Sequence, residues 1–236
     1  LRDLHPTWGG RKLRARLLSL DILDVPAAST ITAILRRNDR LDPAESEKRG
    51  AFVRFEREQP NDLWQMDFKG DFALTGGGRC HPLTVLDDHS RFSLCVRACP
   101  DVRGAGVRTA LVDAFRRYGM PREMLCDNGS PFAAPHGRAE HTRLTAWLLR
   151  LDVRVLHGRP YHPQTQGKEE RFHRTLKAEA IAGRRFDTQA EVQRTFDAWR
   201  EVYNFERPHE ALGSKPPASR YLVSERAFPE SLPAIE

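Results

Sequence analysis

The segment LWQMDF, residues 63–68, decides how this chain folds, because its pattern defines a strand with which later strands can pair. Its apolar side chains Trp64, Met66 and Phe68 share one face, as the two-residue period of a β-strand requires. Asp67 lies on the other face. A carboxylate inside such a strand has to be paired, protonated, at a strand end or bound to a cation. A partner arginine or an edge position therefore explains Asp67 as well as a metal ion does.

Working outward, apolar runs of strand length occur at residues 83–86, 92–96, 123–126 and 153–156. Amphipathic patterns with a helical period occur at residues 104–118, 138–150, 168–182 and 188–203. The first three strands follow one another through short turns and are expected to pair antiparallel. The later strands alternate with helices. This order predicts an α/β fold in which a mixed five-stranded sheet is flanked by helices.

Four regions are expected along the chain: a partial helix-turn-helix DNA-binding segment at 1–40, a linker at 41–60, a mixed α/β core at 61–205 and a Pro-rich extension at 206–236. In the first region, Leu13, Leu17 and Leu20 recur at helical spacing, and Ser29 and Thr30 can cap a second helix. Two short basic helices joined by a turn are typical of a DNA-binding module. An ordinary helical hairpin with solvated arginines explains the same pattern.

The composition excludes several classes of protein. Lys and Arg number 38 against 32 Asp and Glu, which gives a net charge of +6, and 39% of the residues are hydrophobic. These values exclude a disordered or collagen-like chain, and no apolar run is long enough to cross a membrane. The basic surplus fits a polyanionic partner. Because the chain begins at Leu1 and shows no signal peptide, we expect it to be a fragment of a longer protein. We expect its four cysteines to be small core residues of a reduced, cytoplasmic protein.

Two further carboxylate positions join Asp67 as candidates. Asp127 follows the strand at 123–126 in an Asp-Asn-Gly turn, where it could equally serve only to cap the turn. Asp87 and Asp88 lie in a hairpin turn, and turn capping is our interpretation of both. Glu169 and Glu170 open a helix, where the helix dipole favours acidic residues in any case.

The helical wheel separates the two glutamates. At about 100° per residue, Glu169 falls within an apolar stripe, and Glu170 falls on a flank with two cations. The stripe consists of Phe172, Leu176 and Ala180, and the cations are Arg174 and Lys177. A carboxylate that binds metal beside phosphate-binding cations would look like Glu170. With Asp67 and Asp127 it can converge at one edge of the sheet, where hard oxygen ligands suit Mg²⁺ or Mn²⁺.

Three sequence blocks resemble the catalytic blocks of the DDE transposases and retroviral integrases. They are WQMD at 64–67, CDNGSPF at 126–132 and HPQTQGKEERF at 162–172. In the family the glutamate stands three residues after a glycine, here Gly167. Matched in this way, the resemblance implies a metal-binding catalytic triad of Asp67, Asp127 and Glu170.

The flanking sequence resembles the bacterial branch of this family. The segment YNFERPHEALG at 203–213 resembles the segment that follows the core in insertion-sequence transposases, and WGGRK at 8–12 resembles the end of their helix-turn-helix region. The zinc-binding His/His/Cys/Cys module of retroviral integrases is absent. Asp127 and Glu170 are further apart in sequence than is common in the family, and we expect the extra residues in a loop at 133–141.

The resemblance implies a ribonuclease H-like core that binds two Mg²⁺ ions, for which Mn²⁺ can substitute. Such enzymes hydrolyse one strand of double-stranded DNA at each transposon end, and the freed 3′-hydroxyl then attacks target DNA. The family also implies assembly as a homodimer or higher oligomer on DNA, here in the bacterial cytoplasm at the nucleoid. Two rival functions are a ribonuclease H-like nuclease without strand transfer and a decayed, purely DNA-binding regulator.

Candidate DNA contacts surround the expected glutamate. Arg174 and Lys177 share its flank of the helix, and Lys168 and Arg171 add positive charge beside it. His162 and Gln164 lie in the loop that enters the helix and are expected to position DNA. A solvated helix face and ordinary turn chemistry are the alternative explanations for these residues.

Overall fold

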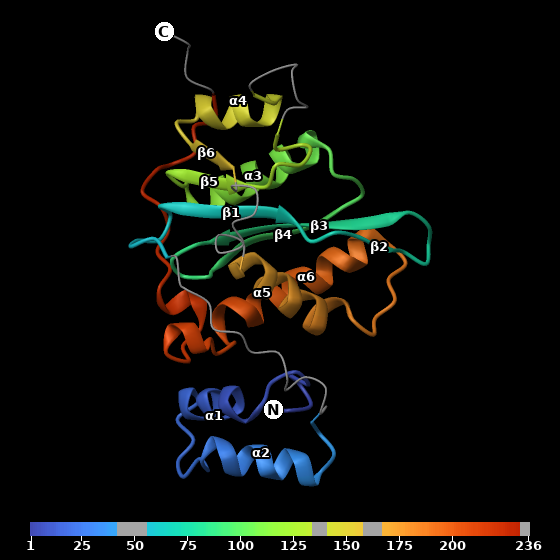
Figure 1. The fold of residues 1–236 in the computed structure, drawn as a ribbon, viewed down its shortest axis with the longest axis vertical. Coiled ribbons are helices and arrows are strands. Elements are labelled where there is room, and N and C mark those ends of the chain that lie inside the picture. The colour runs from blue at the N-terminus through green and yellow to red at the C-terminus, as the bar shows by residue number, and fades with distance from the viewer. Residues whose placement is uncertain (42–55, 134–140, 158–166, 232–236) are drawn as a thin grey trace.

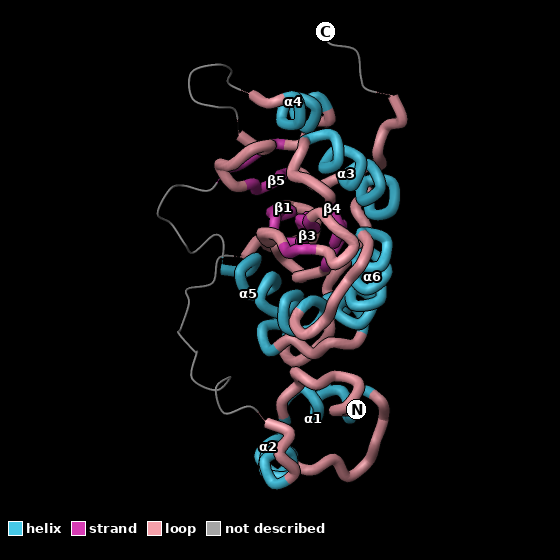
Figure 2. The backbone as a smooth tube through the Cα atoms, turned by 90° about the vertical axis from the view of Figure 1, so that its right-hand side faces the viewer, coloured by secondary structure: helices cyan, strands magenta, loops and turns pink. Residues whose placement is uncertain are grey.

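The computed structural model describes residues 1–41, 56–133, 141–157 and 167–231. A central sheet lies between two layers of helices, and a small unit of two helices lies beyond one of these layers (Figure 1). Seen along the sheet, α3 and α4 cover one face, and α5 and α6 cover the other (Figure 2). None of the helices in the described residues has the length and apolar composition that crossing a bilayer requires.

The sheet contains the five expected strands and a sixth. They are β1 (Leu63–Phe68), β2 (Phe72–Ala73), β3 (Arg79–Asp87), β4 (Ser93–Cys99), β5 (Glu123–Cys126) and β6 (Arg154–His157). The order β2-β3-β1-β5-β6, with β4 paired to β3, is antiparallel around β3 and parallel from β1 to β6. The expected count of five was wrong because β2 has two residues, too few to show an alternating pattern, and pairs only across the turn at 74–78.

The helices of the core are α3 (Gly104–Tyr118), α4 (Arg143–Arg150), α5 (Gly167–Leu176) and α6 (Gln189–Phe205). The π-helical turn η2 (Lys177–Ile181) extends α5, and two short 3₁₀ turns, η3 (Glu210–Leu212) and η4 (Pro217–Ser219), follow α6. α4 begins five residues later than expected, where Thr142 and Thr145 form a reciprocal cap. Most of the loop expected at 133–141 lies outside the described residues.

Two apolar clusters hold the layers together. The face of β1 that carries Trp64 and Met66 packs with α3 and α4, and both side chains are fully buried. On the other side of the sheet, Phe172, Leu176 and Phe196 pack α5 and α6 against Leu86 and Val96. The polar face of β1, which carries Gln65 and Asp67, consequently looks toward the layer that contains α5.

The four cysteines belong to this core. All four are buried thiols without a disulfide, and Cys95 and Cys99 lie on β4. Burial raises the pKa of the Cys95 thiol to about 11. The expectation that the cysteines serve as small core residues is confirmed.

The N-terminal unit consists of α1 (Gly10–Ser19) and α2 (Ala28–Arg37) around Trp8, Leu13, Ile31 and Leu35. A Cβ on Gly10 would lie 2.5 Å from the carbonyl oxygen of Ala28, so the helices approach too closely there for any side chain. α2 begins at Ala28 without a side-chain cap, so the expected caps Ser29 and Thr30 lie inside the helix instead. Arg16 joins the unit to the core through an ion pair with Glu206 at 2.7 Å.

The C-terminal segment, residues 220–231, packs along the surface of the core in an extended conformation. Tyr221 stacks on Phe92 with 4.2 Å between ring centroids. Further along, an Arg226 guanidinium donates to the carbonyl oxygen of Asp152 at 2.7 Å. This segment is poor in regular structure, as its prolines indicate, yet its aromatic and arginine side chains close one side of the core.

Candidate active site

The parallel pairing of β1 and β5 brings two aspartates to one edge of the sheet. Met66 on β1 is the register partner of Cys126, the last residue of β5, so Asp67 and Asp127 each come one residue after this pair. Asp127 caps its own turn, where its Oδ1 accepts a hydrogen bond from the Gly129 amide at 3.0 Å. The turn-capping interpretation of Asp127 is thus correct, and it does not exclude the functional one.

The two aspartates are close enough to disturb each other electrostatically. Burial, and secondly the charge of Asp127, raise the pKa of Asp67 to about 6, although a hydrogen bond from the Phe68 amide opposes the shift. Burial and the neighbouring carboxylate therefore outweigh any positive charge that the described residues place near Asp67. An acidic pair of this kind at a strand edge is typical of a functional site.

The structure brings Glu169, rather than Glu170, up to the two aspartates. Glu169 is 6% exposed, and burial followed by the charges of Asp67 and Asp127 raises its pKa well above the usual range. Its Oε1 atom is buried and has no hydrogen-bond partner among the described residues. The helical wheel correctly placed Glu169 on the buried stripe of the helix. Glu170, the residue that we expected beside the aspartates, is exposed on the next face.

The carboxylates do not form a closed metal cage in this conformation. Within the described ranges of the chain, no group of three or more His, Cys, Asp and Glu side chains is arranged so that it could hold an ion. The chemistry of the donor set nevertheless fits a hard divalent cation, because carboxylate oxygens are its preferred ligands and Glu169 Oε1 has no hydrogen-bond partner among the described residues.

His173 on α5 lies beside Asp67 and was not identified from the sequence. Its Nδ1 is 3.9 Å from Asp67 Oδ2, and its Nε2 is 2.8 Å from the Thr84 hydroxyl. Thr84 in turn donates to the Asp67 carbonyl oxygen at 3.1 Å. Burial, and secondly the charge of Lys69, lower the pKa of His173 to about 4, so the ring is neutral and the contact is not an ion pair. The sequence could have indicated His173, because it stands four residues after Glu169 and therefore lies on the same face of the helix.

Positive charge flanks the carboxylates. The expected DNA contacts Arg171, Arg174 and Lys177 are all exposed, and no ion pair engages them among the described residues. Lys69, two residues after Asp67, adds a cation that sequence reasoning missed. Burial, and secondly the charge of Lys177, lower the pKa of Lys69, so these two cations lie close to each other. A phosphate group between them would relieve the repulsion.

Three expected DNA contacts do not take part in this exposed group. His162 and Gln164 lie outside the described residues. Lys168 is described, but its side chain is 13% exposed and forms an internal ion pair with buried Asp88. The expectation that Lys168 contacts DNA therefore needs correction, because its ammonium group is already committed inside the protein.

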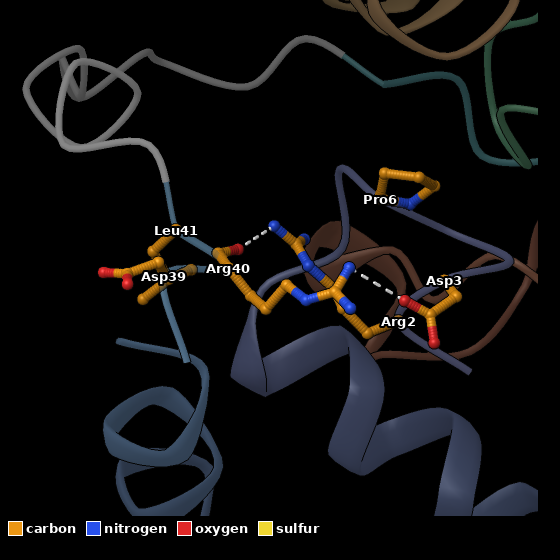
Figure 3. Close-up of a pocket in the computed structure, with 6 residues that line it drawn as sticks. All are labelled: Arg2, Asp3, Pro6, Asp39, Arg40 and Leu41. Atoms are coloured by element: carbon orange, nitrogen blue, oxygen red, sulfur yellow. Dashed lines mark hydrogen bonds and ion pairs between the residues drawn. The ribbon is translucent and has the colours of Figure 1, made fainter. Parts of the chain in front are cut away.

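A separate hollow lies between the N-terminus and the end of α2 (Figure 3). Arg40 forms an ion pair with Asp3 at 2.9 Å, and Arg2 donates to the Arg40 carbonyl oxygen. None of the residues that line this hollow is one of the aspartates or glutamates described above. The candidate active site is therefore the place where Asp67, Asp127 and Glu169 lie close together.

Two family models match the chain. Residues 57–163 match a model described as Integrase core domain, and residues 151–217 match a second model with the same description. The matched ranges together contain both aspartates and both glutamates discussed above.

Two similar curated proteins come from bacterial insertion elements. The chain is 30% identical over 190 residues to the 31.7 kDa protein of insertion element IS407 from Burkholderia multivorans, which covers 78% of this chain and 65% of that protein. It is 33% identical over 159 residues to the 39.2 kDa protein of insertion element IS476 from Xanthomonas euvesicatoria, which covers 67% of this chain and 44% of that protein. The chain therefore spans less than two thirds of the length of either relative.

Solved structures share the fold at low sequence identity. The HTLV-2 integrase catalytic core in complex with magnesium, in its trimeric form, has a TM-score of 0.53 at 13% identity and covers 69% of this chain and 97% of that chain. A chain of the simian T-cell lymphotropic virus intasome, in complex with a PP2A regulatory subunit, has a TM-score of 0.58 at 17% identity and covers 94% and 80%. The expected ribonuclease H-like fold is confirmed.

Replacing Asp67 with asparagine should stabilise the metal-free protein. The folded-state pKa of Asp67 is raised above its value in the unfolded chain, so its ionisation costs stability as the pH rises from about 4 to about 6. We expect Asp67→Asn to increase the free energy of unfolding by roughly 1–3 kcal/mol at pH 7 and to change it little at pH 3. Urea denaturation in EDTA at both pH values measures this.

Asp113→Asn is the matched control, because Asp113 forms an exposed ion pair with Arg97. Its effect should stay within about 1 kcal/mol at both pH values. A loss of stability at pH 7 in Asp67→Asn would show that the carboxylate is compensated in the folded protein.

Proposed function

We propose that this chain, which belongs to the integrase core domain family, is the catalytic part of a bacterial insertion-sequence transposase. In this proposal it hydrolyses one DNA strand at each transposon end and joins the freed 3′-hydroxyl to target DNA. The observation that carries the proposal is the meeting of Asp67 and Asp127 at the carboxyl ends of β1 and β5, beside the helix that opens with Glu169 and Glu170. Carboxylates clustered beside exposed cations suit phosphodiester chemistry.

We propose Asp67, Asp127 and Glu170 as the metal-binding triad, with Mg²⁺ as the natural ion and Mn²⁺ as a substitute. These carboxylates would hold two divalent ions, which would supply activation of an attacking oxygen and stabilisation of a leaving oxygen. Glu170 is exposed and so can meet a ligand that arrives from solvent with DNA. Glu169 is buried, and burial followed by the charges of Asp67 and Asp127 raises its pKa, so we do not propose it as a metal ligand.

The cations of the site would hold the DNA. Arg171, Arg174 and Lys177 are exposed along α5 and η2, and Lys69 approaches them from β1. We propose that these groups bind the phosphates of the transposon end, and that His162 and Gln164 position the strand from the loop before α5. The two-helix unit at 1–40 would add a second DNA contact through its exposed arginines, such as Arg36 and Arg37 on α2.

We further propose that the chain acts as a dimer or higher oligomer on paired DNA ends, in the bacterial cytoplasm at the nucleoid. The HTLV-2 core was solved as a trimer, the simian virus relative is part of an intasome, and the curated relatives come from bacterial insertion elements. Joining two transposon ends to one target requires two active sites, which a single chain does not offer.

A strand-transfer assay tests the proposed function. The wild-type chain is incubated with Mg²⁺, labelled duplexes from the ends of its own insertion sequence and plasmid target DNA. We expect nicked transposon ends and labelled plasmid. Nicked ends without joining would instead indicate a nuclease, and binding without nicking would indicate a decayed regulator.

Substitution of the glutamates discriminates between the two candidates on α5. We expect Glu170→Gln to reduce cleavage by at least about 100-fold, because a neutral amide binds the ion weakly, and to leave DNA affinity within about twofold. Glu169→Gln should retain cleavage, because in this proposal Glu169 does not bind the ion. The reverse result would transfer the third position of the triad to Glu169, the residue nearer to the aspartates in this structure.

Removing cations from α5 and η2 should weaken DNA binding in a salt-dependent way. For Arg174→Gln and Lys177→Gln, we expect the slope of log affinity against log salt to decrease by about 0.9 for each phosphate that the variant no longer neutralises. Fluorescence anisotropy with a labelled duplex at several salt concentrations measures it. Arg122→Gln is the control, because Arg122 precedes β5 at the opposite end of the strand from Asp127. An unchanged slope in the α5 variants would exclude these residues as DNA contacts.

A further inference from the structure

An internal ion pair joins the first turn of α5 to the turn between β3 and β4. Lys168 Nζ contacts Asp88 Oδ1 and also donates to the Asp88 carbonyl oxygen at 3.1 Å. Asp88 is 0% exposed, and the Lys168 side chain is 13% exposed. The two residues are 80 positions apart in sequence, so this contact exists only in the folded protein.

Asp88 is itself tied to β1. Its Oδ1 accepts a hydrogen bond from Gln65 Nε2 at 2.6 Å, and its Oδ2 accepts one from the Arg57 amide at 2.7 Å. Its own amide donates to the Leu63 carbonyl oxygen at 2.9 Å. Gln65 stands two residues before Asp67, on the same face of the strand. A chain of polar contacts therefore leads from α5 through Asp88 to the strand that carries the first aspartate.

Because of the position of Lys168 in α5, this chain of contacts also determines where the two glutamates lie. Lys168 is the second residue of the helix, and Glu169 and Glu170 follow it directly. Whatever holds the backbone at Lys168 against β1 also sets how far the two glutamates lie from Asp67 and Asp127. Removing the lysine would take its positive charge away from the buried Asp88 carboxylate, so the start of the helix would lose this ion pair with the turn between β3 and β4.

We propose that Lys168 is a positioning residue whose ion pair with Asp88 holds the first turn of α5 in register with β1 and so assembles the metal-binding carboxylates. The inference rests on the proposed function for the role of those carboxylates. It assigns Lys168 to the architecture of the site instead of to DNA, in contrast to the exposed cations Arg174 and Lys177 on the same side of the chain.

Lys168→Met tests the proposal, because methionine retains the apolar part of the side chain and removes the charge. Two measurements are made without DNA: Mn²⁺ binding, followed by the electron paramagnetic resonance of unbound Mn²⁺, and hydrogen–deuterium exchange of peptides from the start of α5. We expect Mn²⁺ affinity to fall by about 10-fold or more, as for other residues that orient metal ligands. Amide exchange at the start of α5 should accelerate by a similar factor, while exchange in α3 stays unchanged.

Duplex affinity at several salt concentrations separates positioning from DNA contact. Lys168→Met should keep the wild-type affinity and salt slope. The matched variant Lys177→Met should bind the duplex more weakly, with a smaller slope, and keep wild-type Mn²⁺ affinity and exchange. Lys168→Arg should restore Mn²⁺ binding, because a guanidinium can still pair with Asp88. In a double-mutant cycle, Asp88→Asn should add little to Lys168→Met.

The opposite pattern would overturn the proposal. If Lys168→Met binds Mn²⁺ and exchanges as the wild type does, and its salt slope decreases by about 0.9, Lys168 is a phosphate contact. If Lys168→Met does not fold, equal Mn²⁺ affinity and exchange in Lys168→Gln and the wild type would overturn the proposal as well. Failure of the wild type in the strand-transfer assay would refute the proposed function separately, since the exchange measurement requires neither catalysis nor DNA.

Discussion

The parallel pairing of β1 with β5 is the constraint on which the rest of this structure depends. It places Asp67 and Asp127 side by side at the carboxyl ends of their strands, although like charges repel and burial raises the pKa of Asp67. The strands cannot separate to relieve this repulsion, because fully buried side chains such as Trp64 and Met66 lock β1 into the apolar layer beneath α3 and α4. The folded protein therefore keeps two mutually repelling carboxylates at the carboxyl ends of β1 and β5. Such an arrangement is typical of functional sites.

The two faces of β1 have different roles in the fold. One face supplies the apolar core, and the other carries Gln65 and Asp67 toward α5. Along this polar face, two sets of polar contacts join α5 to β1. Asp88 contacts both Gln65 and Lys168, and the Thr84 hydroxyl contacts both the Asp67 carbonyl oxygen and His173. The helix that supplies the glutamates is thereby aligned with the strand that supplies the first aspartate.

Much of the fold could be predicted because the relevant signals are local. The alternation in residues 63–68 marked β1, and an apolar run before Asp-Asn-Gly marked β5 and its turn. Even the burial of Glu169 followed from the spacing of Phe172 and Leu176. β2 was not predicted, because two residues are too few to show a periodic pattern. The packing of Tyr221 on Phe92 was not predicted either, because it joins segments that are distant in sequence.

The sequence by itself determined which side chains are available and in what order: one aspartate inside a strand pattern, one directly after another, two glutamates opening a helix, and cations on its flank. Only the tertiary structure decided which of these groups meet. Lys168 resembles its neighbours Arg171 and Arg174 in sequence, yet it is paired with a buried aspartate while they remain exposed. The reason is physical: periodicity depends on neighbours along the chain, whereas the partner of a charge depends on which distant backbone the packing of the core brings beside it.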